Sequence, residues 1–465
     1  QIGLELIAEA EVKMCQHCKD HEDKTMCPGL AHEFVQLVND IYIDDIFWPS
    51  ESDDKAQKLM SYVSECLNKY QYSLKGWNYS FKVSSQDDPC LDGDLLMSVG
   101  GNYYDQQEDK IYFKAPLQHN GTKWRGAIIQ QKATYKKEEN GKKKLFHPPP
   151  LQILDFKLGR ELTFKKLEDL FQGSQKTLKL LVSKTNAHYD PSGLLSPLIS
   201  QLRDTCRQAT LFCKGQMEAE VHPNIWSLWL KQHYEVLRCT KHAYPRLQDV
   251  HLIEYGQVSV IASADASTGL IITVHLSHPN SLGTRSITFH TSNSYLADSS
   301  TSIPKLELTS GSIASFLANQ IRMELGKRVK DVKLLMDSLI AIFWVINNSD
   351  HLSTFVHNRV KNIRSNIDVV KELYHVAGKH NLSDIGTKFK RIPDFNNPDK
   401  MSKERMLTAE DVAPNSLFHL GPTFYKDMNK AEKDGIIRSV STIRQTHNML
   451  KDDDLLEYNA EFKKD

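Results

Sequence analysis

The order of strand-like and helix-like patterns between residues 250 and 392 is the feature that most constrains the fold of this chain. Alternating apolar residues predict a strand that ends at Asp265, and two further strands follow at 270–276 and 286–291. Beyond them we expect, in order, a helix opening at Pro304, a buried strand at 332–336, a helix through Ile346, a helix at 354–364, a strand at 373–376 and a last helix starting near Ser383. The order β-β-β-α-β-α-β-α predicts a mixed five-stranded sheet flanked by helices.

Four acidic residues stand at the ends of these elements. Asp265 and Asp337 end strands, Glu307 lies in the first turn of a helix, and Asp384 begins the last helix. Such positions can converge at one edge of a sheet, and convergent carboxylates repel one another unless cations lie between them. Carboxylates suit Mg²⁺, so two Mg²⁺ (or Mn²⁺) ions that clamp a scissile phosphate are the predicted cofactors. The alternative is four unrelated surface acids, with Asp337 acting only as a helix cap.

The segments around these acids resemble the ribonuclease H blocks of BEL/Pao long-terminal-repeat retrotransposons. The resemblance is carried by residues 264–267, 303–308, 336–338, 354–360, 375–384 and 420–422. It implies that Asp265, Glu307, Asp337 and Asp384 bind the metal ions and cleave the RNA strand of RNA–DNA hybrids. It also suggests His380, or else His375, as a histidine that helps the product to leave. Leu335-Met336 and Ile385-Gly386-Thr387-Lys388 depart from the family pattern.

Tyr42-Ile43-Asp44-Asp45 stands between apolar flanks and predicts a hairpin over residues 34–48, with the two acids at its turn. This tetrapeptide resembles the metal-binding motif of reverse transcriptases. The amphipathic helix expected after Asp53 and residues 74–77 resemble the segment on the C-terminal side of that motif. Residues 188–197 resemble a BEL/Pao block between polymerase and nuclease. Such polymerases need a further aspartate upstream, and only 43 residues precede Asp44, so we expect no DNA synthesis by this chain alone.

The resemblance extends over most of the chain and implies a multidomain protein of α/β and α+β class. The expected parts are a partial reverse-transcriptase palm at 1–80, a thumb- or connection-like region at 81–245, a ribonuclease H-like domain at 250–392 and a polar, loosely packed tail at 393–465. Within the second part, Asn140-Gly141 predicts a hairpin over 135–146. Helices are expected from about 161 to 240. The implied partners are an RNA–DNA hybrid and the remaining reverse transcriptase and integrase parts of a polyprotein.

The formal net charge is zero, so nucleic-acid binding must rest on local basic patches. Residues 351–391 hold eight Lys or Arg against three acids. This segment predicts five contacts to a hybrid's phosphates: Arg359, Lys361, Arg364, Lys379 and Lys388. The lysines at 136–137 and 142–144 flank a turn, and they indicate either a second phosphate contact or a solvated hairpin.

No apolar run approaches the roughly 18 residues that a membrane-spanning helix needs, and we expect no membrane partner. Eight scattered cysteines favour a reducing compartment over a disulfide framework. The expected location is the cytoplasm, in a virus-like particle, with the nucleus as the alternative. Cys15, Cys18, His21 and Cys27 indicate either a zinc site or a polar loop, because their spacing lacks a second half-site.

Two hypotheses therefore stand side by side. The first is a metal-dependent nuclease for RNA–DNA hybrids. The second is a catalytically inactive module, decayed or co-opted, that binds nucleic acid without cutting it. The ordered acids favour the first hypothesis, and the departures near Asp337 and Asp384 favour the second. An integrase of the same fold is a third possibility, and it leaves the 303–308 block unexplained.

Overall fold

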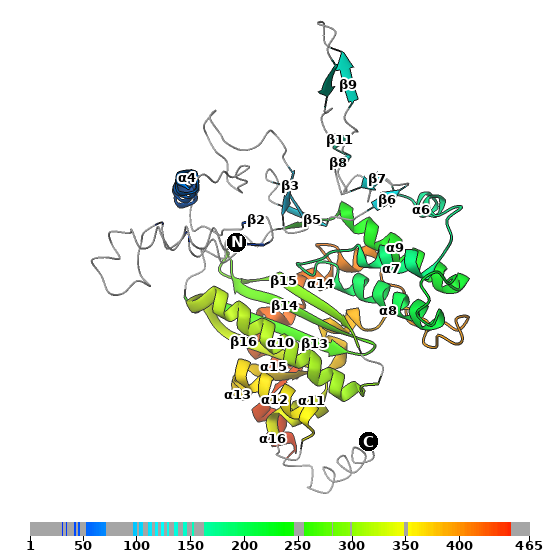
Figure 1. Ribbon diagram of the computed structural model, residues 1–465. Helices are drawn as coiled ribbons and strands as arrows, with labels where there is room; N and C mark the ends of the chain where they lie inside the picture. The colour runs from blue at the N-terminus through cyan, green and yellow to red at the C-terminus, as the bar shows by residue number, and fades with distance from the viewer. Residues whose placement is uncertain are drawn as a thin grey trace. The chain divides into compact units, whose positions relative to one another are not determined.

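The larger part of the chain is organised by one mixed sheet of six strands, and the computed structural model gives their order as β15-β14-β13-β16-β17-β18 (Figure 1). The strands are β13 (Val258–Ala266), β14 (Gly269–Pro279), β15 (Arg285–Leu296), β16 (Val329–Met336), β17 (Leu373–Val376) and β18 (Ile437–Ser439). The central strand β13 pairs antiparallel with β14 and parallel with β16. The sheet is therefore antiparallel at both ends and parallel in the middle.

The structure describes backbone and side chains over several stretches: 54–70, 102–105, 110–113, 162–245, 255–280, 282–297, 300–347 and 352–446, with Leu30 and Phe34. For several short strands between residues 41 and 152 it describes only the backbone pairing. The chain divides into two units, one made of residues 1–97 and 105–109, the other of 98–104 and 110–465. All of the sheet lies in the second unit.

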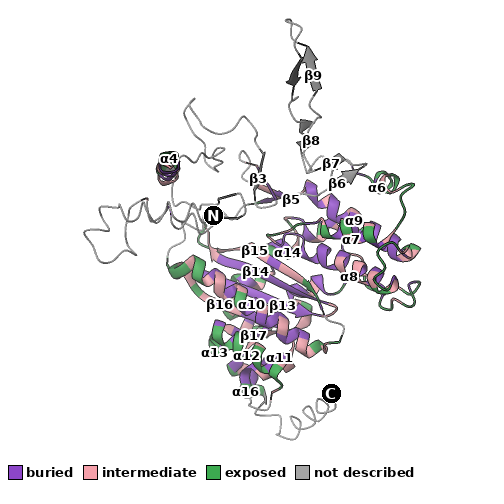
Figure 2. Ribbon diagram, in the orientation of Figure 1, coloured by how far each residue is buried: buried purple, intermediate pink, exposed green. Residues whose placement is uncertain are grey.

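One face of the sheet is covered by α10 (Ile303–Leu325), α11 (Leu339–Asn347), α12 (Thr354–Asn366) and α16 (Val440–His447), with the short α13 (Val369–Glu372) beside them. The helix α10 begins with a proline in its first turn and ends at Gly326, whose φ of 54° suits a residue without a side chain. Val260, Ala262 and Ala264 alternate along β13 and pack in the same core as α10. Burial is continuous from the strands into α10 (Figure 2).

Four helices form a second core beside β15: α6 (Phe164–Leu170), α7 (Leu178–Asn186), α8 (Ser196–Phe212) and α9 (Pro223–Arg238). They are followed by η1 (Cys239–Lys241) and β12 (Ala243–Pro245). The expected helical character of residues 161–240 is confirmed. This core also takes in Phe389, Leu407 and Phe418 from far along the chain, and α8 packs against β15. The helical core and the sheet therefore pack against each other across the expected boundary near residue 250.

Residues 393–446 differ from the loosely packed polar tail that the sequence predicts. They contain η6 (Ala409–Val412), α14 (Leu417–Leu420), η7 (Thr423–Lys426) and α15 (Met428–Lys433) before β18 and α16. The fully buried Gln201 of α8 binds the backbone of Leu407 through both its amide atoms, at 3.0 and 3.1 Å. Phe418, Tyr425 and Ile437 are buried as well. The apolar residues of this segment follow no regular period, so the sequence pattern gives no sign of their packing.

The number of strands and the last helix also differ from the prediction. The sheet has six strands, not five, because β18 pairs antiparallel with β17. In place of a helix from Ser383 there is a single 3-10 segment, η5 (Leu382–Gly386). A side chain at Gly386 would lie 2.6 Å from Ile271, so this position packs directly on β14 and the chain turns away there. The other helices and strands predicted from residue 255 to 376 are confirmed.

In the first unit, the strands β1 (Ile41–Tyr42) and β2 (Asp45–Ile46) pair antiparallel, with Tyr42 opposite Asp45. This confirms a hairpin at this place, although Phe34, expected in its first strand, is helical. Asp44 lies outside the described residues, so the polymerase role of both acids stays a prediction. The helix α4 (Asp53–Lys69) confirms the amphipathic helix, with Leu59, Val63 and Leu67 buried.

Short strands occupy residues 96–152. They are β3 (Leu96–Val99), β4 (Asn102–Asp105), β5 (Lys110–Phe113), β6 (Leu117–His119), β7 (Thr122–Trp124), β8 (Ile128–Ile129), β9 (Thr134–Lys137), β10 (Lys143–Phe146) and β11 (Leu151–Gln152). The pairing of β9 with β10 confirms the hairpin predicted around Asn140-Gly141. The candidate zinc residues and residues 74–77 lie outside the described part.

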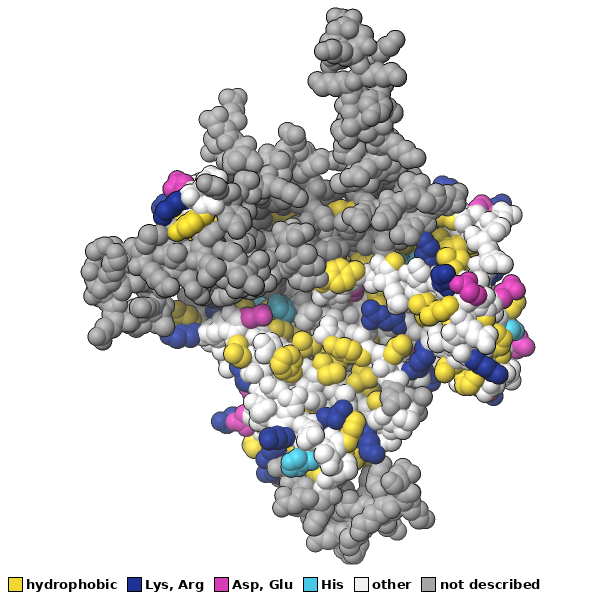
Figure 3. Space-filling view, in the orientation of Figure 1, with side chains coloured by type: hydrophobic (Ala, Val, Ile, Leu, Met, Phe, Trp, Pro, Cys, Tyr) yellow, Lys and Arg dark blue, Asp and Glu magenta, His cyan; other side chains and the backbone are white. Residues whose placement is uncertain are grey.

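The outer face of α10 carries three large exposed apolar side chains, Ile303, Phe316 and Met323. Figure 3 shows hydrophobic side chains gathered on the face of the molecule where this helix lies. Among the residues described, no helix is both long and apolar enough to span a lipid bilayer.

The helical core packs closely against the sheet at Gly193. Gly193 has a φ of +70°, and a methyl group there would overlap the carbonyl oxygen of Ser292 on β15. The Asp190 carboxylate holds the same turn by accepting hydrogen bonds from the backbone of Leu194 and Leu195, at 2.9 and 2.8 Å. The residue 188–197 block thus has a structural function in fixing α8 against the sheet.

Replacing Gly193 with alanine should destabilise the protein by roughly 2–4 kcal/mol, because left-handed strain adds to a steric clash with β15. The measurement is the free energy of unfolding from urea denaturation. Gly173→Ala is the matched control, because Gly173 has a φ of +79° with nothing within 4 Å of the added carbon. It should lose only the strain component of about 1–2 kcal/mol. Equal losses in both variants would contradict the close approach to Ser292.

Candidate metal centre

Three of the four predicted acids meet at one edge of the sheet. One carboxylate oxygen from each of Asp265, Glu307 and Asp337 lies within 4.8 Å of the other two. Trans ligands around Mg²⁺ are about 4.2 Å apart, because each metal–oxygen bond is about 2.1 Å. The three carboxylates therefore need only a small adjustment to share one cation. The expected convergence is confirmed for these three residues.

Strand register brings Asp265 and Asp337 together. Ala264 of β13 lies opposite Met336 of the parallel strand β16, so the next residue on each chain, Asp265 within β13 and Asp337 just past β16, comes to the same edge of the sheet. Asp337 is not the helix cap of the alternative interpretation, since Ser338 accepts the hydrogen bond from the Ala341 backbone at the start of α11.

Glu307 reaches this edge because α10 approaches β16 closely. Gly311, one turn further along α10, faces the Met336 side chain, and an added methyl group would lie 2.5 Å from it. A side chain at Gly311 would have to displace the end of the Met336 side chain, which packs there in the space that the glycine leaves. The sequence shows the glycine at position 311. Its pattern does not indicate that this glycine affects how closely α10 approaches β16.

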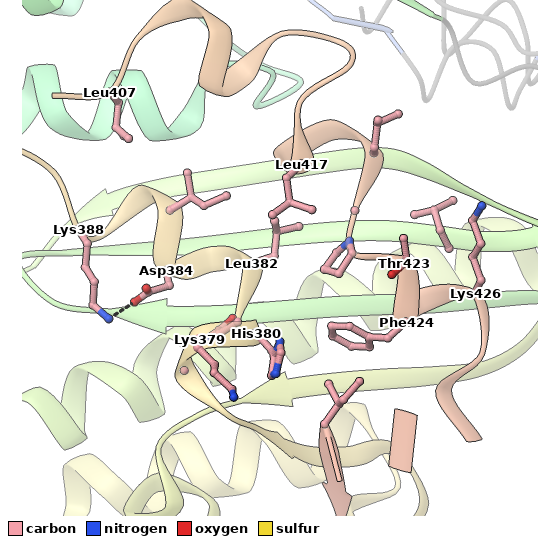
Figure 4. A pocket seen from close by; sticks show the side chains of 18 of the residues that line it. Lys379, His380, Leu382, Asp384, Lys388, Leu407, Leu417, Thr423, Phe424 and Lys426 are labelled. Atoms are coloured by element: carbon pink, nitrogen blue, oxygen red, sulfur yellow. Dashed lines mark ion pairs between the residues drawn. The ribbon is translucent and has the colours of Figure 1, made fainter. Parts of the chain in front are cut away.

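Asp384 lies beside this cluster rather than within it. Its carboxylate accepts a hydrogen bond from the Lys388 ammonium at 2.7 Å, within an ion pair one helical turn apart (Figure 4). Its negative charge still raises the pKa values of Asp265, Glu307 and Asp337. The predicted fourth acid is thus within electrostatic range of the other three and carries its own counter-ion.

Burial governs the protonation of the cluster. It is the largest cause that raises the pKa of Asp265 to about 7 and that of Glu307 to about 10, with repulsion from neighbouring carboxylates adding to it. The pKa of Asp337 is raised by burial as well. Glu307 Oε2 and Asp337 Oδ1 are buried without a hydrogen-bond partner among the described residues. Unpaired buried carboxylate oxygens are costly, and a cation would pair both.

Residues of the 381–387 loop hold the carboxylates, and the sequence argument missed them. Thr387 donates to Asp265 Oδ2, which orients that carboxylate. Asn381 hydrogen-bonds the side chain of Asp337, and its amide nitrogen donates to the Ala264 carbonyl at 3.0 Å. Ser263 in turn donates to Asn381 at 2.5 Å. Asn381 and Thr387 each lie three residues from Asp384 in the sequence. This proximity is the one feature of the sequence that could have suggested them as site residues.

A second support comes from the helical core. Arg207 of α8 donates to the carbonyls of Thr268 and Ala297, at 3.2 and 2.7 Å, while Asp204 pairs with it at 2.5 Å. Thr268 lies just past Asp265, and Ala297 leads toward α10. The guanidinium therefore ties together the segments that carry two of the acids.

The predicted basic contacts separate into two groups. Arg359 donates to Thr309 at 2.8 Å and stacks 3.4 Å from the centre of the Phe355 ring, and Arg364 donates to the Val345 carbonyl at 2.6 Å. These two arginines already join helices, while Lys361 of α12 is exposed. Lys379 is also exposed, and only Lys379 and Lys388 of the five line the pocket that adjoins Asp384.

The two candidate histidines, His375 and His380, differ in their surroundings. Burial, followed by the charge of Arg438, lowers the pKa of His375 to about 4. Arg438 donates to His375 Nδ1 at 3.1 Å, so this ring is held in the sheet. His380 lines the same pocket as Lys379, and its ring lies edge-on to Phe424 with centroids 6.3 Å apart. Of the two, His380 has the accessible position that a role in product release requires.

Comparison with known families gives a match for part of this region. Residues 177–338 match the family model described as Pao retrotransposon-like RNaseH-like domain. Residues 177–338 are therefore similar to the RNase H-like domain of Pao-type retrotransposons. The matched range begins in the helical core, crosses the expected boundary at 245–250 and includes Asp265, Glu307 and Asp337. It ends before Asp384. The comparison with curated proteins found no match.

The pKa shifts predict a pH dependence of stability in metal-free protein. Glu307 binds its proton more tightly in the folded state, with a pKa of about 10 against an ordinary 4.5. Its contribution to stability is therefore complete below about pH 4.5 and is lost as the pH rises toward 10. Each pH unit in this window lowers stability by up to about 1.4 kcal/mol per shifted group. Asp265 adds a similar loss up to about pH 7.

Glu307→Gln should therefore flatten this loss between pH 7 and 10 and raise the melting temperature in EDTA at pH 8, because an amide carries no charge to bury. The measurement is thermal unfolding across that range in EDTA. Glu324→Gln, at an exposed position on the same helix, is the control and should follow the unmodified protein. A Glu307→Gln profile parallel to that of the unmodified protein would show that Glu307 titrates normally.

Proposed function

We propose that this protein hydrolyses the RNA strand of RNA–DNA hybrids at the cluster of Asp265, Glu307 and Asp337, with divalent cations as cofactors. The observation that carries the proposal is a pair of buried carboxylate oxygens, Glu307 Oε2 and Asp337 Oδ1, that have no hydrogen-bond partner among the described residues and belong to a triad whose oxygens lie within 4.8 Å of one another. All three donors are oxygens, and oxygen donors are typical of Mg²⁺ and Mn²⁺ sites. Two such ions would activate a water molecule and stabilise the leaving oxygen of a phosphodiester.

The protein residues would supply position and charge in this reaction. Asp265, oriented by Thr387, and Asp337, oriented by Asn381, would bind the cations from two strand ends. Glu307 would complete the site from α10 and would lose its proton on binding metal, because a cation favours the charged carboxylate. His380 and Lys379 at the rim would contact the phosphate backbone. Recognition of the hybrid would rest on 2′-hydroxyl contacts and groove shape.

The alternative is a binding module that holds hybrids without cutting them. Lys388 favours it in one respect, because its ammonium already balances Asp384, the acid expected to help hold a second cation. The triad favours the nuclease, because two buried carboxylates and a half-buried one, gathered together, are costly to a protein that never binds a cation there. Cleavage assays separate the two functions.

The test is an incubation of a blunt, labelled RNA–DNA hybrid with Mg²⁺, with double-stranded RNA and double-stranded DNA as substrate controls. Asp337→Asn should reduce cleavage by at least about a hundredfold, because a neutral amide is a poor metal ligand. Asp331→Asn is the matched control on the same strand, since Asp331 pairs with Lys333 at 3.7 Å and stands outside the triad. Binding of the hybrid without cleavage by the unmodified protein would support the binding module.

A second experiment concerns the fourth acid. Lys388→Met should lower the Mg²⁺ concentration at which a second ion binds by about two- to fivefold, because an exposed ion pair with Asp384 contributes roughly 0.2–1 kcal/mol. Isothermal titration calorimetry of Mg²⁺ without nucleic acid gives the number of ions and their affinities. Lys390→Met serves as the control. An unchanged second affinity in Lys388→Met would mean that Asp384 holds no cation.

A further inference from the structure

A pocket of about 930 Å³ lies next to the acid cluster and is built largely by the C-terminal segment (Figure 4). One wall is the loop of η4 (Gly378–His380) and η5, and the opposite wall is residues 417–426. The match to the Pao-type family ends at residue 338, so both walls lie outside the matched range. The pocket is therefore a feature of this chain that the family comparison does not explain.

The pocket combines positive charge with apolar surface. Lys379, Lys388, Arg405 and Lys426 line it, against the single acid Asp384. Lys388 is paired with Asp384, and Arg405 with Asp411 at 2.5 Å. Lys379 and Lys426 are exposed and form no ion pair within the described part of the chain. Among the described residues, the pocket therefore has two ammonium groups without an ion-pair partner, those of Lys379 and Lys426, and its one carboxylate, Asp384, is already paired.

The apolar surface includes a ring suited to stacking. Phe424 is half-buried and lies edge-on to His380, and Figure 4 shows both rings within the pocket. Leu417 and Leu420 leave 56% and 54% of their surface exposed and add apolar surface to this wall. Flat apolar groups next to ammonium groups match a ligand that carries both planar bases and phosphates.

The pocket also meets the acid cluster directly. Gly378 lines it, and a methyl group at Gly378 would lie 3.3 Å from Asp337 Oδ2. Asp384 belongs to the pocket and acts electrostatically on the cluster. A polynucleotide that enters the pocket would therefore run past the carboxylates, within about one nucleotide of them.

We propose that this pocket binds a single-stranded segment of nucleic acid that continues from the hybrid held at the acid cluster. Its volume lies in the range of small-ligand pockets and suits about one or two nucleotides. An unpaired base would stack on Phe424, and Lys379 and Lys426 would contact the flanking phosphates. This inference rests on the proposed function, because it extends the substrate from a blunt hybrid to a hybrid with a single-stranded tail.

The experiment measures binding without cleavage. The probe is a fluorescently labelled oligo-dT of twelve nucleotides, with its anisotropy followed in EDTA, so the result does not depend on whether the nuclease is active. Phe424→Ala should weaken binding by roughly tenfold, because one stacked base is lost. Lys426→Ala, at an exposed position, should reduce the dependence of log affinity on log salt by about 0.7.

The control variant is Lys430→Ala with Lys433→Ala, on the neighbouring helix α15 and outside the pocket. It should leave affinity and salt dependence close to those of the unmodified protein. Thermal unfolding of each variant separates a loss of binding from a loss of fold, and Lys426→Ala keeps the test valid if Phe424→Ala destabilises the protein.

Four further outcomes test the proposed occupant of the pocket. Hybrids with a single-stranded tail should bind more tightly than blunt hybrids, and Phe424→Ala should remove that difference. Equal effects of the pocket and control variants would overturn the proposal, as would competition by poly-glutamate at the same concentration as oligo-dT, which would identify an acidic protein segment as the ligand. Binding of tails by a protein that cleaves nothing would support the pocket and reject the nuclease.

Discussion

The parallel pairing of β13 with β16 is the constraint on which the site depends. Its register sets Ala264 opposite Met336, so the residues that follow, Asp265 and Asp337, come to the same edge of the sheet. A shift by one residue would turn one of the two acids to the other face of the sheet. The other contributions depend on this edge, since Gly311 lets α10 approach Met336 and the 381–387 loop folds back to hold both carboxylates.

Burial of the carboxylates links stability to metal binding. Desolvation raises the pKa of Glu307 to about 10 and that of Asp265 to about 7, so Glu307 holds a proton at neutral pH in the metal-free cluster and the protein loses stability as the two acids ionise. A cation reverses this balance, because it pairs the ionised oxygens and releases the protons. The surrounding fold must therefore supply the stability that the site lacks, and Arg207 and Asn381 make hydrogen bonds that do so from two sides.

The sequence predicted most of the sheet because the apolar residues of the central strand alternate and because the helix α10 has recognisable ends. Val260, Ala262 and Ala264 alternate clearly, and Pro304 and Gly326 delimit α10. The four acids could be named because each ends or begins an element. Distances could not be predicted, since they depend on the contact between Gly311 and Met336. The sixth strand could not be predicted either, because β18 has three residues and gains its place only by pairing with β17.

The C-terminal segment, residues 393–446, packs against both the helical core and the sheet. Leu407 binds Gln201 of α8, Phe418 packs in the helical core, and Ile437 extends the sheet. The same segment forms one wall of the pocket beside Asp384. A segment that only covered apolar surface would bury its leucines, yet Leu417 and Leu420 are more than half exposed at that wall. Their exposure next to Lys426 is explained if the wall is completed by a ligand that carries both apolar and anionic groups.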